Sequence, residues 1–141
     1  MRKFTLIILS VLMPLLTVQA KDPADKVFKP KEIKKVMTRA ALWQLGNPKH
    51  ALYDWTNGAF YAGISAAYKT TRNKALLDAM ISMGEANQWK PGPRLHHADD
   101  HAICQTYIDV YRLKKDPKMI NPFIDQMDKF LATPYQTGGI R

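Results

Sequence analysis

Cysteine is almost absent from this chain: Cys104 is the single one in 141 residues. One cysteine excludes an intrachain disulfide framework. Because Cys104 lies in an apolar helical stretch, we interpret it as a small buried side chain rather than a nucleophile. The formal net charge is +9, with a modest lysine cluster at residues 26–35 that contains no series of aromatic residues. This favours a solvated helix face over a nucleic-acid surface, although weak attraction for polyanions remains compatible.

Long hydrophobic runs are also scarce, and the one at residues 6–16 lies near the N-terminus. Arg2 and Lys3 precede it, and Val18-Gln19-Ala20 follows with small residues at the positions that signal peptidase requires. We therefore predict a signal peptide over residues 1–20 and an exported chain of residues 21–141, periplasmic or secreted. A membrane-anchoring helix is disfavoured, because the run contains Pro14 and is too short to cross about 30 Å of hydrocarbon. We expect no membrane association after cleavage.

Sustained alternation of apolar and polar residues is missing, which argues against β-strands. The apolar spacing is helical instead, and it predicts an all-α chain. Predicted helices cover residues 33–45, 58–70, 73–88, 100–113 and 117–131. Gly46-Asn47-Pro48 ends the first, and Trp89-Lys90-Pro91-Gly92-Pro93 separates the third from the fourth. Pro117 suits the first turn of the last helix.

A repeat underlies the last four predicted helices. When the chain is shifted by 43 residues, a tyrosine ends the first helix of both copies, a polar turn follows, and an apolar stripe opens the second helix. The aligned pairs are Tyr68 with Tyr111, Asn73 with Asp116, Leu76 with Met119, and Leu77 with Ile120. Chance similarity between amphipathic helices is the alternative. Repeated helical hairpins bury their apolar faces against their neighbours, in open solenoids or closed toroids.

The hairpin pattern stops while an apolar edge is still expected. No polar capping helix follows Leu131, and residues 135–141 read as a loop. We interpret the chain as a fragment of a longer array. A natural short protein that dimerises through its open edge is the competing interpretation.

Two segments with chemically versatile side chains occupy equivalent places in the two copies. They are residues 53–63, which are rich in aromatics, and residues 93–102, which contain histidines and a pair of aspartates. The shift of 43 places residues 55–58 on residues 98–101, so both segments should open the first helix of their hairpin. In a toroid those openings line the same end, where one pocket would collect aromatics and carboxylates.

Each of these side chains also has a purely structural interpretation. Asp99 and Asp100 are either helix N-caps or functional carboxylates, and two adjacent aspartates exceed what one cap needs. His97 and His101 have a spacing that a metal site can use, but no third ligand has a fixed position, so we predict no metal and no cofactor. The rings of Trp55 and Tyr61 either stack on sugar or pack in the core.

These segments carry a resemblance to a known group of enzymes. Residues 55–63 (Trp-Thr-Asn-Gly-Ala-Phe-Tyr-Ala-Gly), residues 89–94 (Trp-Lys-Pro-Gly-Pro-Arg), and residues 97–101 with Gln105-Thr106-Tyr107 resemble glycoside hydrolase families 88 and 105. These are the unsaturated glucuronyl and rhamnogalacturonyl hydrolases. The similarity keeps its order and spacing from about residue 51 to residue 131. It implies a six-hairpin (α/α)6 toroid, incomplete in this chain.

The resemblance also implies a reaction and a substrate. The substrate carries a 4,5-unsaturated uronic acid at its non-reducing end, as in oligosaccharides that lyases release from pectin or glycosaminoglycans. An aspartic acid protonates C4 of the vinyl ether, water adds at C5, and the resulting hemiketal opens to release the neighbouring sugar. The principal acid of the family follows an aromatic-rich segment that is missing here, so activity of this chain alone is in doubt.

The resemblance assigns roles to the candidate residues as well. It makes Asp100, with Asp99, the assisting carboxylate, and we favour Asp100 as the pocket residue and Asp99 as the cap. Trp55 and Tyr61 are predicted to stack on sugar, and His97 and Arg94 to contact a substrate carboxylate. A non-catalytic helical-repeat module that binds carbohydrate or another partner is the alternative.

Overall fold

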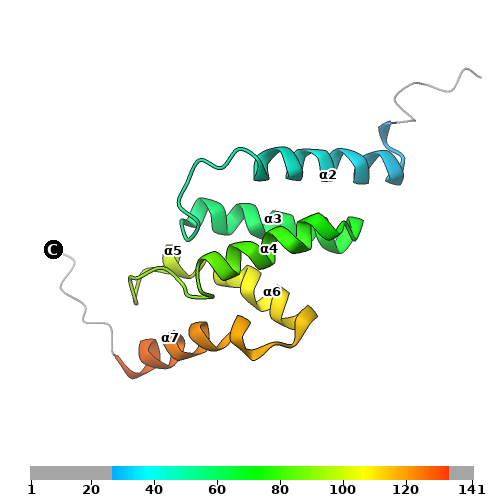
Figure 1. Cartoon of the computed structure of the whole chain (residues 1–141). Helices are drawn as coiled ribbons and strands as arrows, with labels where there is room; N and C mark the ends of the chain where they lie inside the picture. The colour runs from blue at the N-terminus through cyan, green and yellow to red at the C-terminus, as the bar shows by residue number, and fades with distance from the viewer. Residues whose placement is uncertain (1–26, 134–141) are drawn as a thin grey trace, which may run out of the picture.

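The computed structural model describes residues 27–133, and within them the fold is all helical (Figure 1). The helices are α2 (Pro30–Leu45), α3 (Trp55–Thr71), α4 (Lys74–Ala86), α5 (Ala98–His101), α6 (Cys104–Lys114), the 3-10 helix η1 (Pro117–Met119) and α7 (Asn121–Ala132). The predicted all-α class is confirmed. The predicted signal peptide, residues 1–20, lies outside the described residues. Among residues 27–133, no helix has the length and apolarity that crossing a membrane requires.

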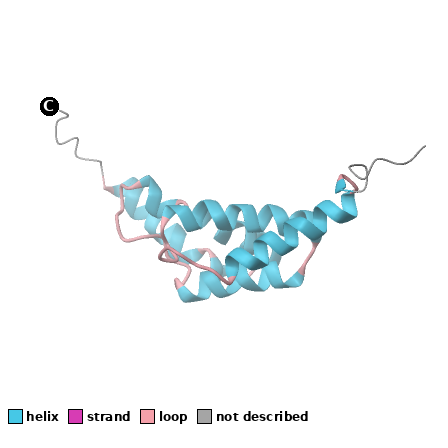
Figure 2. Ribbon diagram, turned by 90° about the horizontal axis from the view of Figure 1, so that it is seen from above, coloured by secondary structure: helices cyan, strands magenta, loops and turns pink. Residues whose placement is uncertain are grey.

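Successive long helices run in alternating directions, so that the chain is a row of helical hairpins (Figure 1). The α2–α3 connection, the long connection from α4 to α5, and the start of α3 all lie at one end of the row, the left end in Figure 1. Seen from above, the longer loops gather at that same end (Figure 2). We call it the loop end. The prediction that residues 53–63 and 93–102 share one end of the array is thereby confirmed.

The turns inside the two hairpins confirm the 43-residue repeat. Arg72 after α3 and Lys115 after α6 adopt nearly identical left-handed conformations, with φ of 58° and 59°. Their backbone N–H groups donate to the carbonyls of Tyr68 (2.8 Å) and Tyr111 (2.7 Å), and each cation lies 5.8 Å from the centre of that same tyrosine ring. The tyrosines that the repeat aligned therefore form the same turn twice.

The helices after these turns also begin alike. The side chain of Asn73 caps α4 by accepting from the N–H of Ala75 (2.9 Å), and that of Asp116 caps η1 by accepting from the N–H of Lys118 (3.1 Å). Leu76 and Met119 then enter the core. Asparagine and aspartate are good caps because a short side-chain acceptor satisfies a free N–H of the first turn.

Two of the predicted helices are interrupted. The fourth was expected to be continuous from residue 100 to 113, but it is split into α5 and α6 by Ala102 and Ile103, where the N–H of Ala102 and that of Thr106 bond three residues back instead of four. The backbone is tightened where Gly58 of α3 approaches; a Cβ on Gly58 would lie 2.8 Å from Cβ of Ala102. The fifth predicted helix is divided into η1 and α7, and Pro117 does open the first turn of η1.

The core lies between α3, α4 and α6. Its fully buried side chains come from all three helices and include Ile64, Leu76, Met80, Tyr107 and Val110. One polar tie crosses it: buried Asp109 on α6 accepts from Oγ of Ser65 (2.6 Å) and from Nζ of Lys69 (2.9 Å) on α3. Burial opposes ionisation of Asp109, but these two donors outweigh it and lower its pKa.

Both outer helices keep apolar side chains at the surface. On α7 none of the described residues is buried, and Ile124, Phe130 and Leu131 are all exposed. On α2 only Ala41 is buried, whereas Trp43 is 65% exposed. The apolar edge that the sequence predicted beyond the last hairpin is confirmed, and α2 provides a second one.

Candidate functional site

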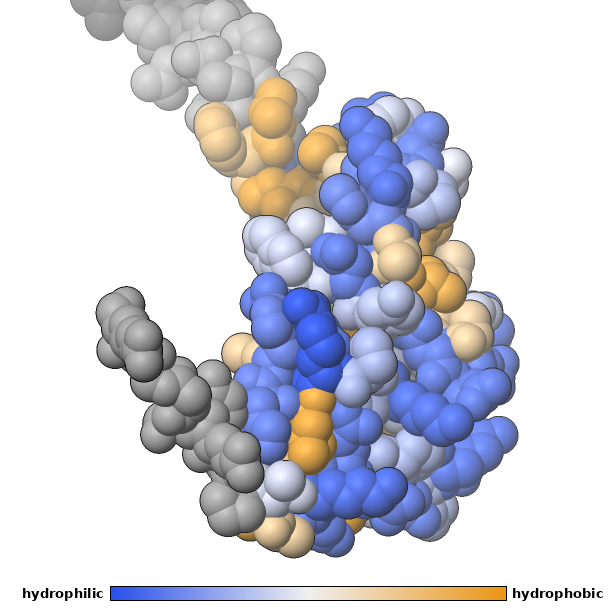
Figure 3. Space-filling view, turned by 90° about the vertical axis from the view of Figure 1, so that its left-hand side faces the viewer, coloured by the Kyte–Doolittle hydropathy of each residue, from blue (hydrophilic) through white to orange (hydrophobic). Residues whose placement is uncertain are grey.

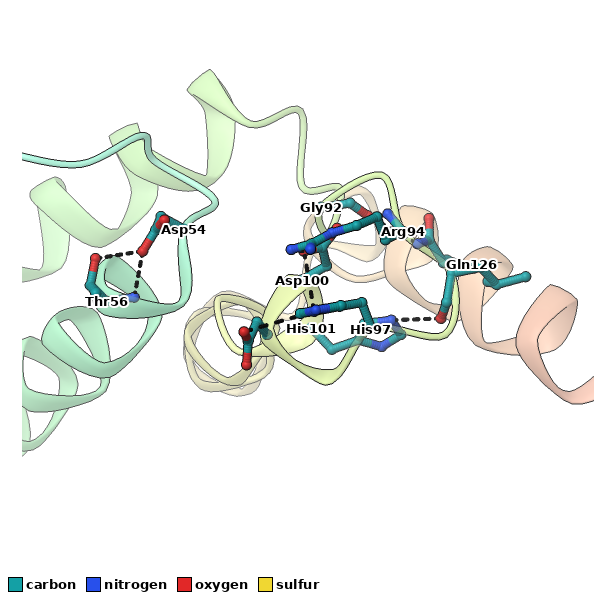
Figure 4. Close-up of polar contacts among 10 residues, drawn as sticks. Asp54, Thr56, Gly92, Arg94, His97, Asp100, His101 and Gln126 are labelled. Carbon is teal, nitrogen blue, oxygen red and sulfur yellow. Dashed lines mark hydrogen bonds and ion pairs between the residues drawn. The ribbon is translucent and has the colours of Figure 1, made fainter. Parts of the chain in front are cut away.

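The two chemically versatile segments begin their helices at matching positions. Helix α3 starts at Trp55 and α5 starts at Ala98, which are 43 residues apart, as the repeat predicted. The carboxylate of Asp54 caps α3 by accepting from the N–H (2.8 Å) and hydroxyl (2.6 Å) of Thr56, and these two bonds lower its pKa (Figure 4). In α5, the two aspartates fall in the first turn. The loop end thus presents the beginnings of both helices.

The most organised feature of this end is an ion pair between Asp100 and Arg94 (Figure 4). Asp100 is 2% exposed, whereas the side chain of Arg94 is 59% exposed. The carboxylate accepts from the backbone N–H of Arg94 (2.7 Å), from its Nε (3.0 Å to Oδ1) and from a terminal guanidinium nitrogen. The guanidinium contacts lower the pKa of Asp100 against the opposing effect of burial. Asp100 is therefore a buried carboxylate that stays ionised at neutral pH.

Gly92 makes this arrangement possible. Its N–H donates to the carbonyl of Asp100 (2.8 Å), and its carbonyl accepts from Nε2 of Gln126 on α7 (3.2 Å). A Cβ added to Gly92 would lie 2.5 Å from Cγ and 2.6 Å from Oδ2 of Asp100. This close approach is the reason that glycine is required here. The backbone conformation does not require it, because the φ of Gly92 is not positive. Neither Gly92 nor Gln126 was predicted as a site residue; the Pro-Gly-Pro sequence was interpreted as a turn within a segment that carries the family resemblance.

A second set of contacts fixes the loop that carries Arg94. The ring of Trp89 covers Gly84, where an added Cβ would lie 2.3 Å from the ring, and stacks edge-on against Tyr107 at 5.5 Å. The hydroxyl of Tyr107 donates to the carbonyl of Lys90 (3.0 Å) and accepts from Asn87 (3.0 Å). The sequence placed Trp89 at the end of a helix and in the family-like segment, but gave its side chain no role. It anchors the start of the loop in the core.

Asp99 and His97 lie on the open side of this pair. Asp99 was predicted as the likelier cap, which is wrong: the residue at the N-cap position of α5 is His97, and no side-chain cap bond is formed there. The side chain of Asp99 is 52% exposed, and Nδ1 of His97 lies 3.8 Å from it and 3.9 Å from Oδ1 of Asp100. Nδ1 of His97 is buried and makes no hydrogen bond. His97 is thus placed between the two carboxylates.

The two aromatic residues predicted for the site differ in exposure. Trp55 is 53% exposed at the loop end, which fits a ring available to a ligand. Tyr61 is 8% exposed and belongs to the core, so the prediction that its ring stacks on sugar is wrong and the packing interpretation holds. Burial also raises the pKa of the Cys104 thiol to about 12, so the interpretation of Cys104 as an inert buried side chain is confirmed. No cluster of three potential metal ligands occurs within residues 27–133, and the ring of His101 bonds to the carbonyl of Leu95 (2.9 Å).

Comparison with known proteins finds relatives of one kind. The family model described as Glycosyl Hydrolase Family 88 matches residues 29–140. An unsaturated 3S-rhamnoglycuronyl hydrolase of Formosa agariphila is 39% identical over 110 residues, which are 77% of this chain and 29% of that protein. A protein of the same name from Alteromonas sp. (strain LOR) is 29% identical over 85 residues, 60% of this chain and 21% of that protein. The chain thus spans less than a third of the length of either relative.

Proposed function

Because the chain belongs to glycosyl hydrolase family 88, we propose that it forms part of a substrate site for hydrolysis of 4,5-unsaturated uronyl residues at the non-reducing end of oligosaccharides. The two relatives are named for action on an unsaturated rhamnoglycuronyl substrate. For this chain we propose only that the substrate carries the unsaturated uronyl group. The oligosaccharide would come from lyase action on pectin, a glycosaminoglycan or a similar polyanion.

The observation that carries this proposal is the location of Asp100, Arg94 and Trp55 at one end of the helix array. An exposed indole ring offers an apolar face to a sugar. The exposed part of the Arg94 guanidinium offers a planar donor to a carboxylate. Asp100 behind it fixes the guanidinium, as a neighbouring hydrogen-bonded carboxylate does in many binding sites. His97 and Asp99 line the open side and would contact the uronate or its hydroxyl groups.

The ionised state of Asp100 limits its part in the chemistry. Hydration of the vinyl ether needs a proton donor for C4, and Asp100 with its lowered pKa does not retain a proton near neutral pH. Its negative charge instead raises the pKa of a second carboxyl group brought close to it, which keeps that group protonated. We therefore assign Asp100 the assisting role. Once that second carboxyl group has protonated C4, water adds at C5, and the hemiketal opens to release the neighbouring sugar.

The lowered pKa of Asp100 also supports a second candidate function, a module that binds the unsaturated sugar without hydrolysing it. Binding needs the ion pair and the indole ring but no protonated acid. The two candidates share their contacts with the ligand and differ only in turnover.

One assay separates them. The chain is mixed with an unsaturated uronyl disaccharide, and both binding and the absorbance of the C4–C5 double bond are followed. Loss of absorbance supports hydrolysis, and binding without loss supports the module. Trp55→Ala should weaken binding by about 1 kcal/mol, or roughly fivefold. Trp43→Ala is the matched control, because Trp43 is similarly exposed but lies on α2. Absence of any binding would contradict both candidates.

Export belongs to the proposal as well. The charged, apolar and small-residue regions of residues 1–20 support cleavage after Ala20. N-terminal sequencing of the protein recovered from the periplasm or medium tests it. A mature chain that retains Met1 contradicts it.

A further inference from the structure

A groove of about 500 Å³ lies beside the Asp100–Arg94 pair. Three parts of the fold form its walls: the α2–α3 loop, the loop between α4 and α5, and helix α7. The lining includes Tyr53, Asn87, Lys90, Gly92, Pro93 and Gln126. The surface at this end of the molecule is predominantly hydrophilic (Figure 3). We call this hollow the Lys90 groove.

The groove is continuous with the candidate site through the chain itself. Tyr53 immediately precedes the cap residue Asp54, and Pro93 immediately precedes Arg94. Gly92 forms part of the groove with one side and packs against the Asp100 carboxylate with the other. The groove therefore borders the residues that would hold the unsaturated sugar.

The lining combines the three kinds of group that a charged sugar needs. The Tyr53 side chain is 47% exposed and offers a ring face. The amides of Asn87 and Gln126 provide polar groups for hydroxyls. Lys90 provides a positive charge, its Nζ donates to the neutral Oε1 of Gln88 (2.8 Å), and within residues 27–133 it forms no ion pair with a carboxylate. None of the residues that line the groove is acidic.

We propose that the Lys90 groove binds the leaving sugar of the substrate, and that Lys90 contacts an anionic substituent on it. The inference rests on the proposed function, since it places the groove next to the bound unsaturated residue. An ammonium group binds a uronate carboxylate or a sulfate ester in the same way, as a point charge. Tyr53 stacks on the sugar ring whichever anion is present. The groove thus selects oligosaccharides that are charged on both sides of the scissile bond.

Binding of three unsaturated uronyl disaccharides tests the proposal. Their leaving sugars are neutral, uronate-bearing and sulfate-bearing, and the whole chain is titrated at low salt by calorimetry and by ¹H–¹⁵N spectra. Lys90→Gln should weaken binding of an anionic disaccharide about fivefold and leave the neutral one unchanged. Tyr53→Ala should weaken all three about fivefold. The amides of residues 87–93 should shift more with an anionic leaving sugar than with the neutral one.

Lys114→Gln is the matched control, because it removes the same charge at the exposed end of α6 away from the loop end. An effect of Lys90→Gln on the sulfate arm alone identifies a sulfated ligand, and an effect on the uronate arm alone identifies a uronate. Equal effects of Lys90→Gln and Lys114→Gln, or equal losses for all three disaccharides, overturn the role of Lys90 while the proposed function stands. Failure of the wild-type chain to bind any of the three removes both proposals.

Discussion

Replacing Gly92 by alanine tests how closely the loop must approach Asp100. The new Cβ would lie 2.5 Å from Cγ of Asp100, so the two groups must separate by about 0.9 Å to reach ordinary contact. Asp100 cannot retreat freely, because it is buried and its carboxylate is held by Arg94. The loop cannot retreat without loosening the bonds of Gly92 to Asp100 and Gln126. Overpacking of this kind lowers the free energy of unfolding by about 2–3 kcal/mol.

The assay is thermal unfolding followed by circular dichroism. For a chain of this size the loss corresponds to a melting temperature lower by about 8–12 °C. Gly63→Ala is the matched control: Gly63 lies inside α3, and an added Cβ meets nothing within 4 Å. It should raise the free energy of unfolding by about 0.5–1 kcal/mol, because alanine favours the helix. The reasoning is refuted if Gly92→Ala melts within 1 °C of the wild type, or if both variants lose stability equally.

Three further predictions follow from burial. Gly84→Ala places a Cβ 2.3 Å from the Trp89 ring and should lower the free energy of unfolding by about 2–3 kcal/mol. Because the ring must move, tryptophan fluorescence should shift to the red. An unshifted spectrum and an unchanged urea midpoint would contradict this. The pKa of Asp100 in the folded chain lies below its ordinary 3.8. The ion pair therefore stabilises the fold at neutral pH, and this stabilisation is lost as the pH falls below 3.8 and through the folded pKa. Asp100→Asn should therefore cost about 1–3 kcal/mol at pH 7 and less than that at pH 3 in urea titrations. An equal cost at both pH values would count against the ion pair. Because the pKa of Cys104 is raised to about 12, a thiol reagent at pH 8 should label it only after unfolding, and rapid labelling of the native chain would disprove its burial.

The repeat was the most informative feature of the sequence. The 43-residue shift predicted that the segments opening α3 and α5 occupy equivalent positions, although both helices begin two or three residues earlier than expected. It also aligned Tyr68 with Tyr111, which accept the same turn bond. Such features are local, because they depend on caps, turn residues and the spacing of apolar side chains. Asp100 was predicted as the functional carboxylate, and its location at the loop end followed from the same alignment.

The partner of Asp100 could not be predicted in the same way. Arg94 was expected to face a substrate carboxylate, yet its guanidinium binds Asp100, six residues further along the chain. That contact depends on how the loop folds over α5, and on Gly92 leaving room for it. The break between α5 and α6 was missed for a similar reason, since it coincides with the approach of Gly58 from another helix. Distances between segments decide these features, and periodicity carries no information about them.

The absence of buried residues in the described part of α7 has a consequence for how the chain opens. In a row of hairpins each helix is held by its contacts with its neighbours, so a helix that buries none of its residues is held least and separates first. Backbone amides of α7 should therefore exchange with deuterium well before those of α6, whose first two turns contain all of its buried side chains. Because Gln126 on α7 holds the carbonyl of Gly92, each such excursion would also release one restraint on the loop that carries Arg94.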